Sequence, residues 1–351
     1  MNFFTSKSAL AKMQAAIIVI IIIVGITVTA IYISNLQAPN PSPNPPSNEP
    51  PQTPSIQLTE TGFNNELGSP HDVSVMGDYA YIADSFNGLR IVDVSDPTNP
   101  PQVGSFNPSG SRRAQGLYFS NPYLYVADGL GLLILDVSDP TNPLEIGFYH
   151  TSGFAVKVHP TNEYAFVADR EGGLLIVNVS DPTNPQLISN YFEAGSVHVL
   201  DVFVSNSYAY IAMEGLGLRI VDISDLSNPQ EIGYFDTQGN AEAVQISGSY
   251  AYLADGEDGL RVFDISNPTN PQEIGFYDTQ GYAQDVYISG NYAFIGDGTS
   301  SLVLIIDISD PTNLKLVTDY ETPGFVWGVY ITDSKVYVAN GENGLRILLQ
   351  S

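Results

Sequence analysis

A motif of about 42 residues recurs from residue 70 to the C-terminus, and it limits the possible folds more than any other feature of the chain. Its clearest marker is the second aromatic residue of a Tyr-Ala-Tyr-like core, which returns at steps of 41 to 44 residues. The seven markers are Tyr81, Tyr125, Phe166, Tyr210, Tyr252, Phe294 and Tyr337. A regular period of this length indicates a repeat architecture, in which each copy forms one unit that packs against its neighbours.

Each copy carries the signals of short β-strands. In residues 241–278, four short apolar runs are separated by Gly-containing turns at 247–249 and 256–259 and by prolines at 268 and 271. Proline cannot donate to a strand ladder, and no window shows the spacing of an amphipathic helix. Seven copies of four antiparallel strands predict an all-β, seven-bladed β-propeller, because coils of leucine-rich or β-helix type have shorter periods.

One stretch of the repeat also resembles a known family. Residues 89–97 read LRIVDVSDP, which is similar to the signature of the LVIVD-repeat proteins, a group of surface-associated β-propellers. Related segments occur at Leu132–Pro140, Leu174–Pro182, Leu218–Asp225, Leu260–Pro268 and Leu304–Pro311. The resemblance covers roughly residues 56–351. It implies a propeller fold, and it implies no particular reaction or catalytic residues.

The N-terminal region has the pattern of a membrane anchor. Residues 15–33 contain no charge, and a helix of this length spans about 28 Å, close to the hydrocarbon thickness of a bilayer. Lys7 and Lys12 precede this run, and the next charged residue is Glu49, so the positive-inside rule places residues 1–14 in the cytoplasm. We expect a transmembrane signal-anchor at 15–34; cleavage as a signal peptide, giving a secreted protein, is the alternative.

Residues 35–54 are expected to form a stalk between the anchor and the propeller at 55–351. Eight prolines lie between positions 38 and 55, among Asn and Ser residues. This composition cannot bury a core and favours extended polyproline II, with a reach of roughly 55 Å. The stalk would hold the propeller clear of the membrane surface.

The two ends of the repeat region are expected to complete one blade together. The seventh copy ends at residues 345–349, which correspond to the third strand of a blade, and the sequence stops at Ser351. Residues 55–62 resemble the missing outer strand. An open ring would leave sheet edges unpaired, so these residues are predicted to close the seventh blade.

The charge of the chain restricts the classes of partner. Residues 49–351 carry a net charge of −28, and this acidity repels phosphate backbones. Nucleic acid is therefore not an expected partner. The sequence contains no cysteine, so neither disulfides nor a cysteine nucleophile can contribute.

A series of aspartates ends the second strand of five copies. Its members are Asp84, Asp128, Asp169, Asp255 and Asp297. Carboxylates bind hard cations, so a ring of them near one channel mouth would suit Ca²⁺, the only cofactor considered for this chain. The alternative is that each aspartate caps the Gly-rich turn that follows it.

Residues that differ between copies are the better candidates for a binding site, because residues common to all copies build the blade. The position just inside each first strand reads His71, Gln115, Phe154, Leu200, Glu242, Gln284 and Trp327. The next position reads Asp72, Gly116, Ala155, Asp201, Ala243, Asp285 and Gly328. We expect these residues to surround one mouth of the channel. The candidate ligand-binding residues are His71, Asp72, Gln115, Asp201, Glu242, Gln284, Asp285 and Trp327.

These observations favour a membrane-anchored extracellular propeller that binds a cell-surface protein or glycan without catalysing a reaction. The sequence lacks a nucleophile elbow, a phosphate-binding loop and His-x-x-x-His spacing. Two alternatives stay open. One is a hydrolase or lyase on sugar or peptide, using His71 with Asp72, Asp201, Glu242 or Asp285; the other is a purely structural envelope component.

Overall fold

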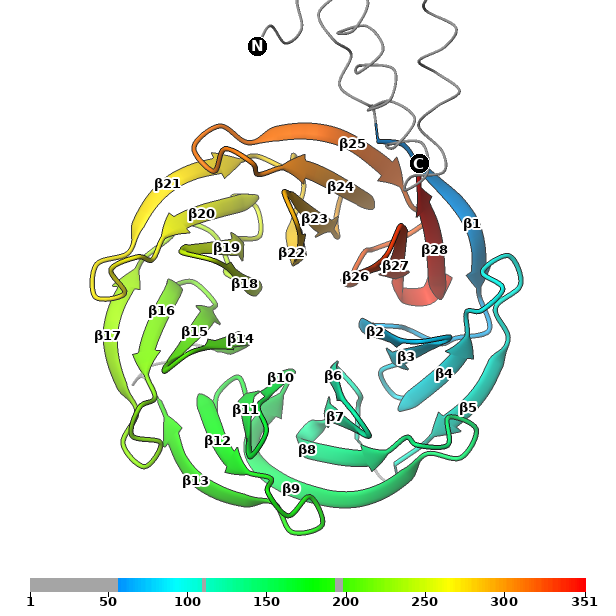
Figure 1. Cartoon of the computed structure of the whole chain (residues 1–351), viewed down its shortest axis with the longest axis horizontal. Helices are drawn as coiled ribbons and strands as arrows, with labels where there is room; N and C mark the ends of the chain where they lie inside the picture. Colours follow the sequence, from blue (N-terminus) through cyan, green and yellow to red (C-terminus); the bar gives the residue numbers. More distant parts are fainter. Residues whose placement is uncertain (1–55, 109–111, 193–197) are drawn as a thin grey trace, which may run out of the picture. The chain divides into compact units, whose positions relative to one another are not determined.

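A computed structural model describes residues 56–108, 112–192 and 198–351, and these residues form seven four-stranded antiparallel sheets. Figure 1 shows the sheets arranged as blades around a central axis, with the first strand of each blade innermost. The prediction of an all-β, seven-bladed propeller is confirmed. Within the described ranges no helix has the length and apolarity needed to cross a membrane. The expected N-terminus at 1–14, anchor at 15–34 and stalk at 35–54 lie outside the described residues.

The first three blades each follow in chain order from the inner to the outer strand. Blade 1 consists of β2 (Asp72–Met76), β3 (Tyr79–Ala83), β4 (Leu89–Asp93) and β5 (Gln102–Phe106). Blade 2 consists of β6 (Gly116–Ser120), β7 (Tyr123–Ala127), β8 (Gly129–Asp136) and β9 (Leu144–Ala155). Blade 3 consists of β10 (Lys157–Pro160), β11 (Tyr164–Ala168), β12 (Leu174–Asn178) and β13 (Gln186–Tyr191).

The next three blades repeat this order. Blade 4 consists of β14 (Val199–Ser205), β15 (Tyr208–Met213), β16 (Gly217–Asp222) and β17 (Gln230–Phe235). Blade 5 consists of β18 (Ala243–Ser247), β19 (Tyr250–Ala254), β20 (Leu260–Asp264) and β21 (Gln272–Tyr277). Blade 6 consists of β22 (Ala283–Ser289), β23 (Tyr292–Asp297), β24 (Leu302–Asp307) and β25 (Lys315–Glu321).

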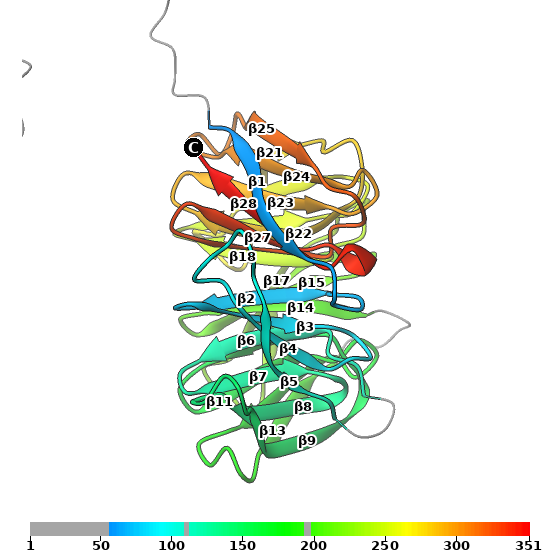
Figure 2. The same cartoon turned by 90° about the vertical axis from the view of Figure 1, so that its right-hand side faces the viewer.

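The seventh blade is built from both ends of the described chain. Its inner strands are β26 (Gly328–Thr332), β27 (Lys335–Ala339) and β28 (Leu345–Gln350), with a short 3-10 helix η1 (Gly341–Asn343) before β28. The outer strand is β1 (Leu58–Asn64), which pairs antiparallel with β28 and lies beside it in Figure 2. Reciprocal backbone hydrogen bonds between Gln57 and Ser351 extend the pairing. The predicted closure by the N-terminal segment is therefore confirmed, with the strand at 58–64.

The hydrophobic core is divided into layers between adjacent blades. Alternating residues of each second and third strand face opposite neighbours, so both faces of a blade are apolar. In blade 1, Tyr81 packs with Leu117 and Leu124 of blade 2, whereas Ile82 packs with Tyr337 and Ile347 of blade 7. Because every blade needs a neighbour on each side, the ring is stable only when it is closed.

A glycine on the outer strand sets the close packing between blades. A Cβ at Gly104 would lie 2.0 Å from the carbonyl oxygen of Pro140 in the next blade, and equivalent contacts occur at Gly147, Gly233 and Gly275. The proline belongs to the repeated Asp-Pro-Thr-Asn-Pro turn, whose first residue accepts two hydrogen bonds from Thr two positions later. These turns therefore form blade-to-blade contacts as well as connections between strands.

Deletion of residues 58–64 from the full chain is expected to lower the melting temperature strongly, because the edge of β28 is then unpaired. Loss of one outer strand should cost several kcal/mol, which corresponds to about 10 °C for a chain of this size. The control is Thr59→Ala, which changes an exposed β1 side chain and keeps the strand. Equal melting temperatures of the deletion variant and the control would contradict closure by β1.

Candidate functional site

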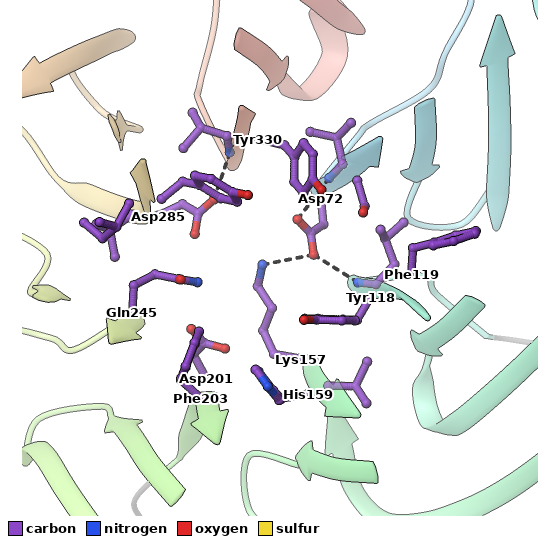
Figure 3. A pocket seen from close by; sticks show the side chains of 18 of the residues that line it. Asp72, Tyr118, Phe119, Lys157, His159, Asp201, Phe203, Gln245, Asp285 and Tyr330 are labelled. Atoms are coloured by element: carbon purple, nitrogen blue, oxygen red, sulfur yellow. Dashed lines mark hydrogen bonds and ion pairs between the residues drawn. The ribbon is translucent and has the colours of Figure 1, made fainter. Parts of the chain in front are cut away.

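The inner strands of the seven blades enclose a cavity of about 500 Å³ on the propeller axis. The side chains on the axis form layers, and each inner strand contributes one residue to each layer. Successive layers are two residues apart in the sequence, because every second side chain of a strand points to the same face. The cavity opens toward the face that carries the hairpins between first and second strands, since Met76, Ser247 and Gly290 line its rim. Figure 3 shows the side chains that converge on it.

Four charged side chains form the layer at the end of the cavity farthest from its opening. We call this layer the floor. It comprises Asp72, Lys157, Asp201 and Asp285, all of which line the cavity. Each lies opposite a buried Ala or Gly of the second strand of its blade, as Asp72 lies opposite Ala83. The other three blades have Gly116, Ala243 and Gly328 at this register position.

The floor aspartates connect neighbouring blades. Asp201 accepts hydrogen bonds from the backbone N–H of Val202, at 2.8 Å, and from that of Val244 in the next blade, at 2.9 Å. Asp72 bonds in the same way to Val73 and Leu117, and Asp285 accepts a bond from Val329. The next blade, which donates the second N–H group, has Gly or Ala at its floor position in each case. The absent or small side chain leaves room for the carboxylate.

Lys157 supplies the only cationic side chain among the described residues that line this cavity. Its Nζ lies 3.0 Å from Oδ2 of Asp72. The sequence alignment of the copies missed this residue, since it assigned Phe154 and Ala155 to the blade 3 positions. Lys157 pairs with Ala168 as Asp72 pairs with Ala83, so Val156 and Lys157 are the correct equivalents. Counting ten residues back from the marker Phe166, as in the other copies, would have found them.

Burial controls the protonation of the floor. It raises the pKa of Asp201 to about 7 and that of Asp285 to about 6, against the opposing charge of Lys157. Burial alone would lower the pKa of Lys157, but the charges of Asp72, Asp285 and Asp201 outweigh it and raise this pKa. Lys157 is therefore a cation at neutral pH, and the two aspartates exchange protons in the physiological range.

Two aromatic walls face each other above the floor. This layer comprises Ser74, Tyr118, His159, Phe203, Gln245, Tyr287 and Tyr330. The rings of Tyr118, His159 and Phe203 follow one another at centroid separations of 5.1 and 4.7 Å, and Tyr287 and Tyr330 are 5.1 Å apart. Ser74 and Gln245 interrupt the aromatic ring on opposite sides. Burial lowers the pKa of His159 to about 4, so its imidazole is neutral.

The residues predicted at the channel mouth divide into two groups. Asp72, Asp201 and Asp285 line the cavity, as expected, whereas the preceding positions are not among its lining residues. This second group comprises His71, Gln115, Glu242, Gln284 and Trp327, together with Leu200. They precede the floor residues in the chain and so lie on the opposite side of the floor from the cavity.

Several members of the second group contact one another instead. His71 stacks on Trp327 at 4.5 Å and its Nδ1 lies 3.2 Å from Oε1 of Gln115, while Gln284 donates to Glu242. Burial lowers the pKa of His71, so this imidazole is largely neutral at pH 7. The side chains of positions 71 and 72 therefore occupy different layers: the aspartates line the cavity, and the preceding residues lie behind the floor.

The aspartates proposed for Ca²⁺ each accept hydrogen bonds from the chain segment that leads into their blade from the preceding one. Asp84 accepts from the N–H groups of Gly68 and Ser69, and Asp169 accepts from Thr151 and Gly153. The other three have similar local donors: Arg112 for Asp128, Thr237 for Asp255, and Tyr282 for Asp297. Among the described residues no group of three His, Asp or Glu side chains is placed to hold a metal ion. Asp84, Asp128 and Asp297 also accept from Asn87, Leu130 and Ser300 in the turn that follows each of them, which supports the turn-capping interpretation for these three.

The floor should make stability fall as the pH rises. An unfolded aspartate has a pKa of about 3.9, so between about pH 4 and 7 the folded chain binds more protons at Asp201 and Asp285 than the unfolded chain does. From pH 5 to 8 these groups should remove on the order of 4 kcal/mol of unfolding free energy. Urea unfolding of the full chain at both pH values measures the difference.

Asp201→Asn and Asp285→Asn should each reduce that pH dependence, whatever constant cost the lost blade contact adds. Asp278→Asn, at an exposed position, is the control and should keep the dependence of the unchanged chain. An unaltered difference between pH 5 and 8 in both floor variants would contradict the assignment.

Comparison with known proteins agrees with this architecture. Three solved propellers are similar in fold. The β-propeller domain of Myceliophteria thermophila Cps50 (Swd1) is 13% identical, with 84% of this chain and 100% of that chain covered and a TM-score of 0.69. The WD40 propeller domain of Doa1 is 12% identical, with 85% of this chain and 98% of that chain covered and a TM-score of 0.67. BamB from Moraxella catarrhalis is 13% identical, with 80% of this chain and 81% of that chain covered and a TM-score of 0.56. At this identity the likeness concerns the fold alone.

No curated protein matches the sequence. A family model does: the LVIVD repeat matches six consecutive segments, residues 67–108, 111–151, 152–192, 196–237, 238–279 and 280–322. The seventh blade lies outside these segments, since β1 precedes the first match and β26–β28 follow the last one. Because the six matches cover well over half of the chain, the protein belongs to the LVIVD-repeat family.

Proposed function

We propose that this protein is a membrane-anchored extracellular binding module that holds a protein or glycan ligand on the cavity-bearing face of its propeller. The observation that carries the proposal is the axial cavity, which has a charged floor and two aromatic walls. A concave site with apolar walls and a few placed polar groups is the usual form of a ligand site. Tyr118 is 40% exposed at this wall, so an incoming ligand can reach it.

The contacts at the floor support binding over catalysis. Both carboxylate oxygens of Asp201 accept backbone hydrogen bonds that hold two blades together. The histidine of the cavity, His159, stands between Tyr118 and Phe203 in the wall and is neutral. The hydrolase alternative relied on His71, which belongs to the layer behind the floor. Rigid inner strands carry all of these groups, which suits a preformed recognition site.

The anchor and the outward orientation follow from the N-terminal sequence. The run at 15–33 is uncharged, the charged residues before it are Lys7 and Lys12, and a Pro-rich segment follows it. This pattern supports insertion with the propeller outside. The acidity of residues 49–351 supports partners other than nucleic acid.

Cysteine labelling tests this topology, because the natural sequence contains no cysteine. Ser105→Cys places one thiol on exposed β5, and Ser6→Cys places one before the anchor. A membrane-impermeant maleimide should label Ser105→Cys on intact cells and Ser6→Cys only after permeabilisation. The opposite pattern would overturn the orientation, and release of the protein by carbonate washing would overturn the anchor.

Binding to the cavity face is tested with the full chain immobilised in detergent and exposed to arrays of purified cell-surface glycans and short peptides. Tyr118→Ser with Tyr330→Ser removes one ring from each wall and should weaken retained ligands at least tenfold. Phe276→Ser changes an aromatic side chain that is 62% exposed on the outer strand β21 and should leave retention unchanged. Equal retention by both variants, or no retained ligand on either array, would contradict the proposed function.

A further inference from the structure

The floor of the cavity is electrostatically asymmetric. Lys157 directs its ammonium to Asp72, as the dashed contact in Figure 3 shows. Asp201 and Asp285 lie on the other side, and among the described residues their hydrogen bonds come from backbone N–H groups. Blade 5 lies between blades 4 and 6, and its Gln245 stands between these two aspartates. We call Asp201 and Asp285 of the floor, together with Gln245 of the layer above them, the acceptor half.

The acceptor half has an excess of negative charge. Three carboxylates and one ammonium give the floor a formal charge of −2 when all are ionised. Asp201 and Asp285 are 9% and 8% exposed, so water screens them little. Burial is the main reason that the pKa values of Asp201 and Asp285 are raised, and neighbouring carboxylates add to it, so without a bound cation the pair holds protons near neutral pH.

The walls above the acceptor half also favour a cation. Phe203 and Tyr287 rise from the same inner strands as Asp201 and Asp285, two residues further toward the open face. An ammonium near the faces of such rings is stabilised by their negative quadrupoles, and the apolar rings pack against an alkyl chain. The hairpins of the inner strands end about 13 Å above the floor, four residues along each strand. An extended lysine side chain is about half as long, so its ammonium reaches the floor when the ligand's backbone enters the cavity from the open face.

A metal ion fits less well. The in-plane lone pairs of the carboxylates already accept backbone N–H groups, and Ca²⁺ needs six to eight oxygen ligands. In the parts of the chain that the structure describes, no three acidic or histidine side chains are grouped for a metal. An ammonium needs only three acceptors, which two carboxylates and one amide oxygen supply.

We propose that the acceptor half, Asp201, Gln245 and Asp285, binds the ammonium group of an alkylammonium ligand whose chain lies between the two aromatic walls. The inference rests on the proposed function, since it names the ligand chemistry of the same cavity. A lysine side chain of a protein partner and a free polyamine both carry this group. The net charge of −28 on residues 49–351 also raises the local concentration of either cation.

Binding of the ammonium is linked to proton release. The titratable or charged groups that face the acceptor half are Asp72 on β2, Lys157 and His159 on β10, and the phenols of Tyr118, Tyr287 and Tyr330. His159 is already neutral, and burial raises the pKa of Tyr118 and Tyr287 above the ordinary value of tyrosine. Between pH 5.5 and 8 the ligand therefore competes with the protons of Asp201 and Asp285, so its affinity should rise with pH.

Isothermal titration calorimetry of the full chain in uncharged detergent tests the inference. The probes are N-acetyl-lysine methylamide, its analogue without the side-chain amine, N-acetyl-norleucine methylamide, and spermidine. The lysine derivative should bind at least tenfold more tightly than the norleucine derivative at pH 8, and about tenfold more weakly at pH 5.5. Its binding enthalpy should also vary with the ionisation enthalpy of the buffer, because protons are released.

Asp201→Asn and Asp285→Asn should each weaken the lysine derivative at least tenfold and reduce the pH dependence, because the remaining aspartate still titrates. Gln245→Leu leaves the blade contacts intact and should weaken it in the same direction, which guards against loss of folding in the Asn variants. Asp278→Asn is the matched control and should bind like the unchanged chain. Tighter binding of spermidine than of the lysine derivative would identify a polyamine as the source, and the reverse order a lysine side chain.

Two results would overturn the inference. One is equal affinity for the lysine and norleucine derivatives; the other is unchanged affinity for the lysine derivative in Asp201→Asn, Asp285→Asn and Gln245→Leu. The proposed function has its own readout. If array ligands are lost with Tyr118→Ser and Tyr330→Ser while ammonium discrimination is absent, the cavity is a binding site for an uncharged ligand. If neither array ligands nor amines respond to the wall variant, the proposed function fails as well.

Discussion

The pairing of β1 with β28 is the contact on which the rest of the structure depends. Each blade has two apolar faces, and its core residues are buried only between two neighbours. A ring missing one outer strand would keep its seven sheets but would leave an edge open and the seventh blade incomplete. Closure by the N-terminal segment joins strands almost 300 residues apart, so local repeats become one cooperative unit.

Closure also determines what happens on the axis. Seven inner strands meet there (Figure 1), and their side chains point inward in layers around the axis. The floor has two roles. Its aspartates, Asp72, Asp201 and Asp285, accept hydrogen bonds from the next blade, and they also present negative charge to the cavity. A single lysine balances part of that charge. The remaining excess lies beneath aromatic walls, and this combination makes the cavity suited to a cationic ligand.

The fold could be predicted almost completely from the sequence, because period, strand pattern and turn residues are local signals that repeat seven times. The closing strand was also predictable, since residues 55–62 resemble the strand that the last copy lacks. The site was predictable only in part. Asp72, Asp201 and Asp285 differ from the residues of other blades, and that difference identified them.

Other features of the site depend on geometry that one sequence does not display. In blade 3 the two positions were placed twelve and eleven residues before Phe166 in place of ten and nine, so Phe154 and Ala155 were assigned where Val156 and Lys157 belong. The cavity lies on the hairpin side of the floor because His71 and Trp327 stack together on the other side. Side-chain packing of this kind is not encoded in residue spacing. The wall residues, such as Tyr118, looked like ordinary strand residues for the same reason.

A crystal structure of the protein grown at pH 8 with n-butylammonium would test the central claim most directly. The account predicts the ammonium nitrogen within hydrogen-bond distance of Asp201, Gln245 and Asp285, with the butyl chain between the walls and Lys157 still on Asp72. An ammonium that displaces Lys157 from Asp72, or an acceptor half that holds only water at saturating ligand, would contradict it.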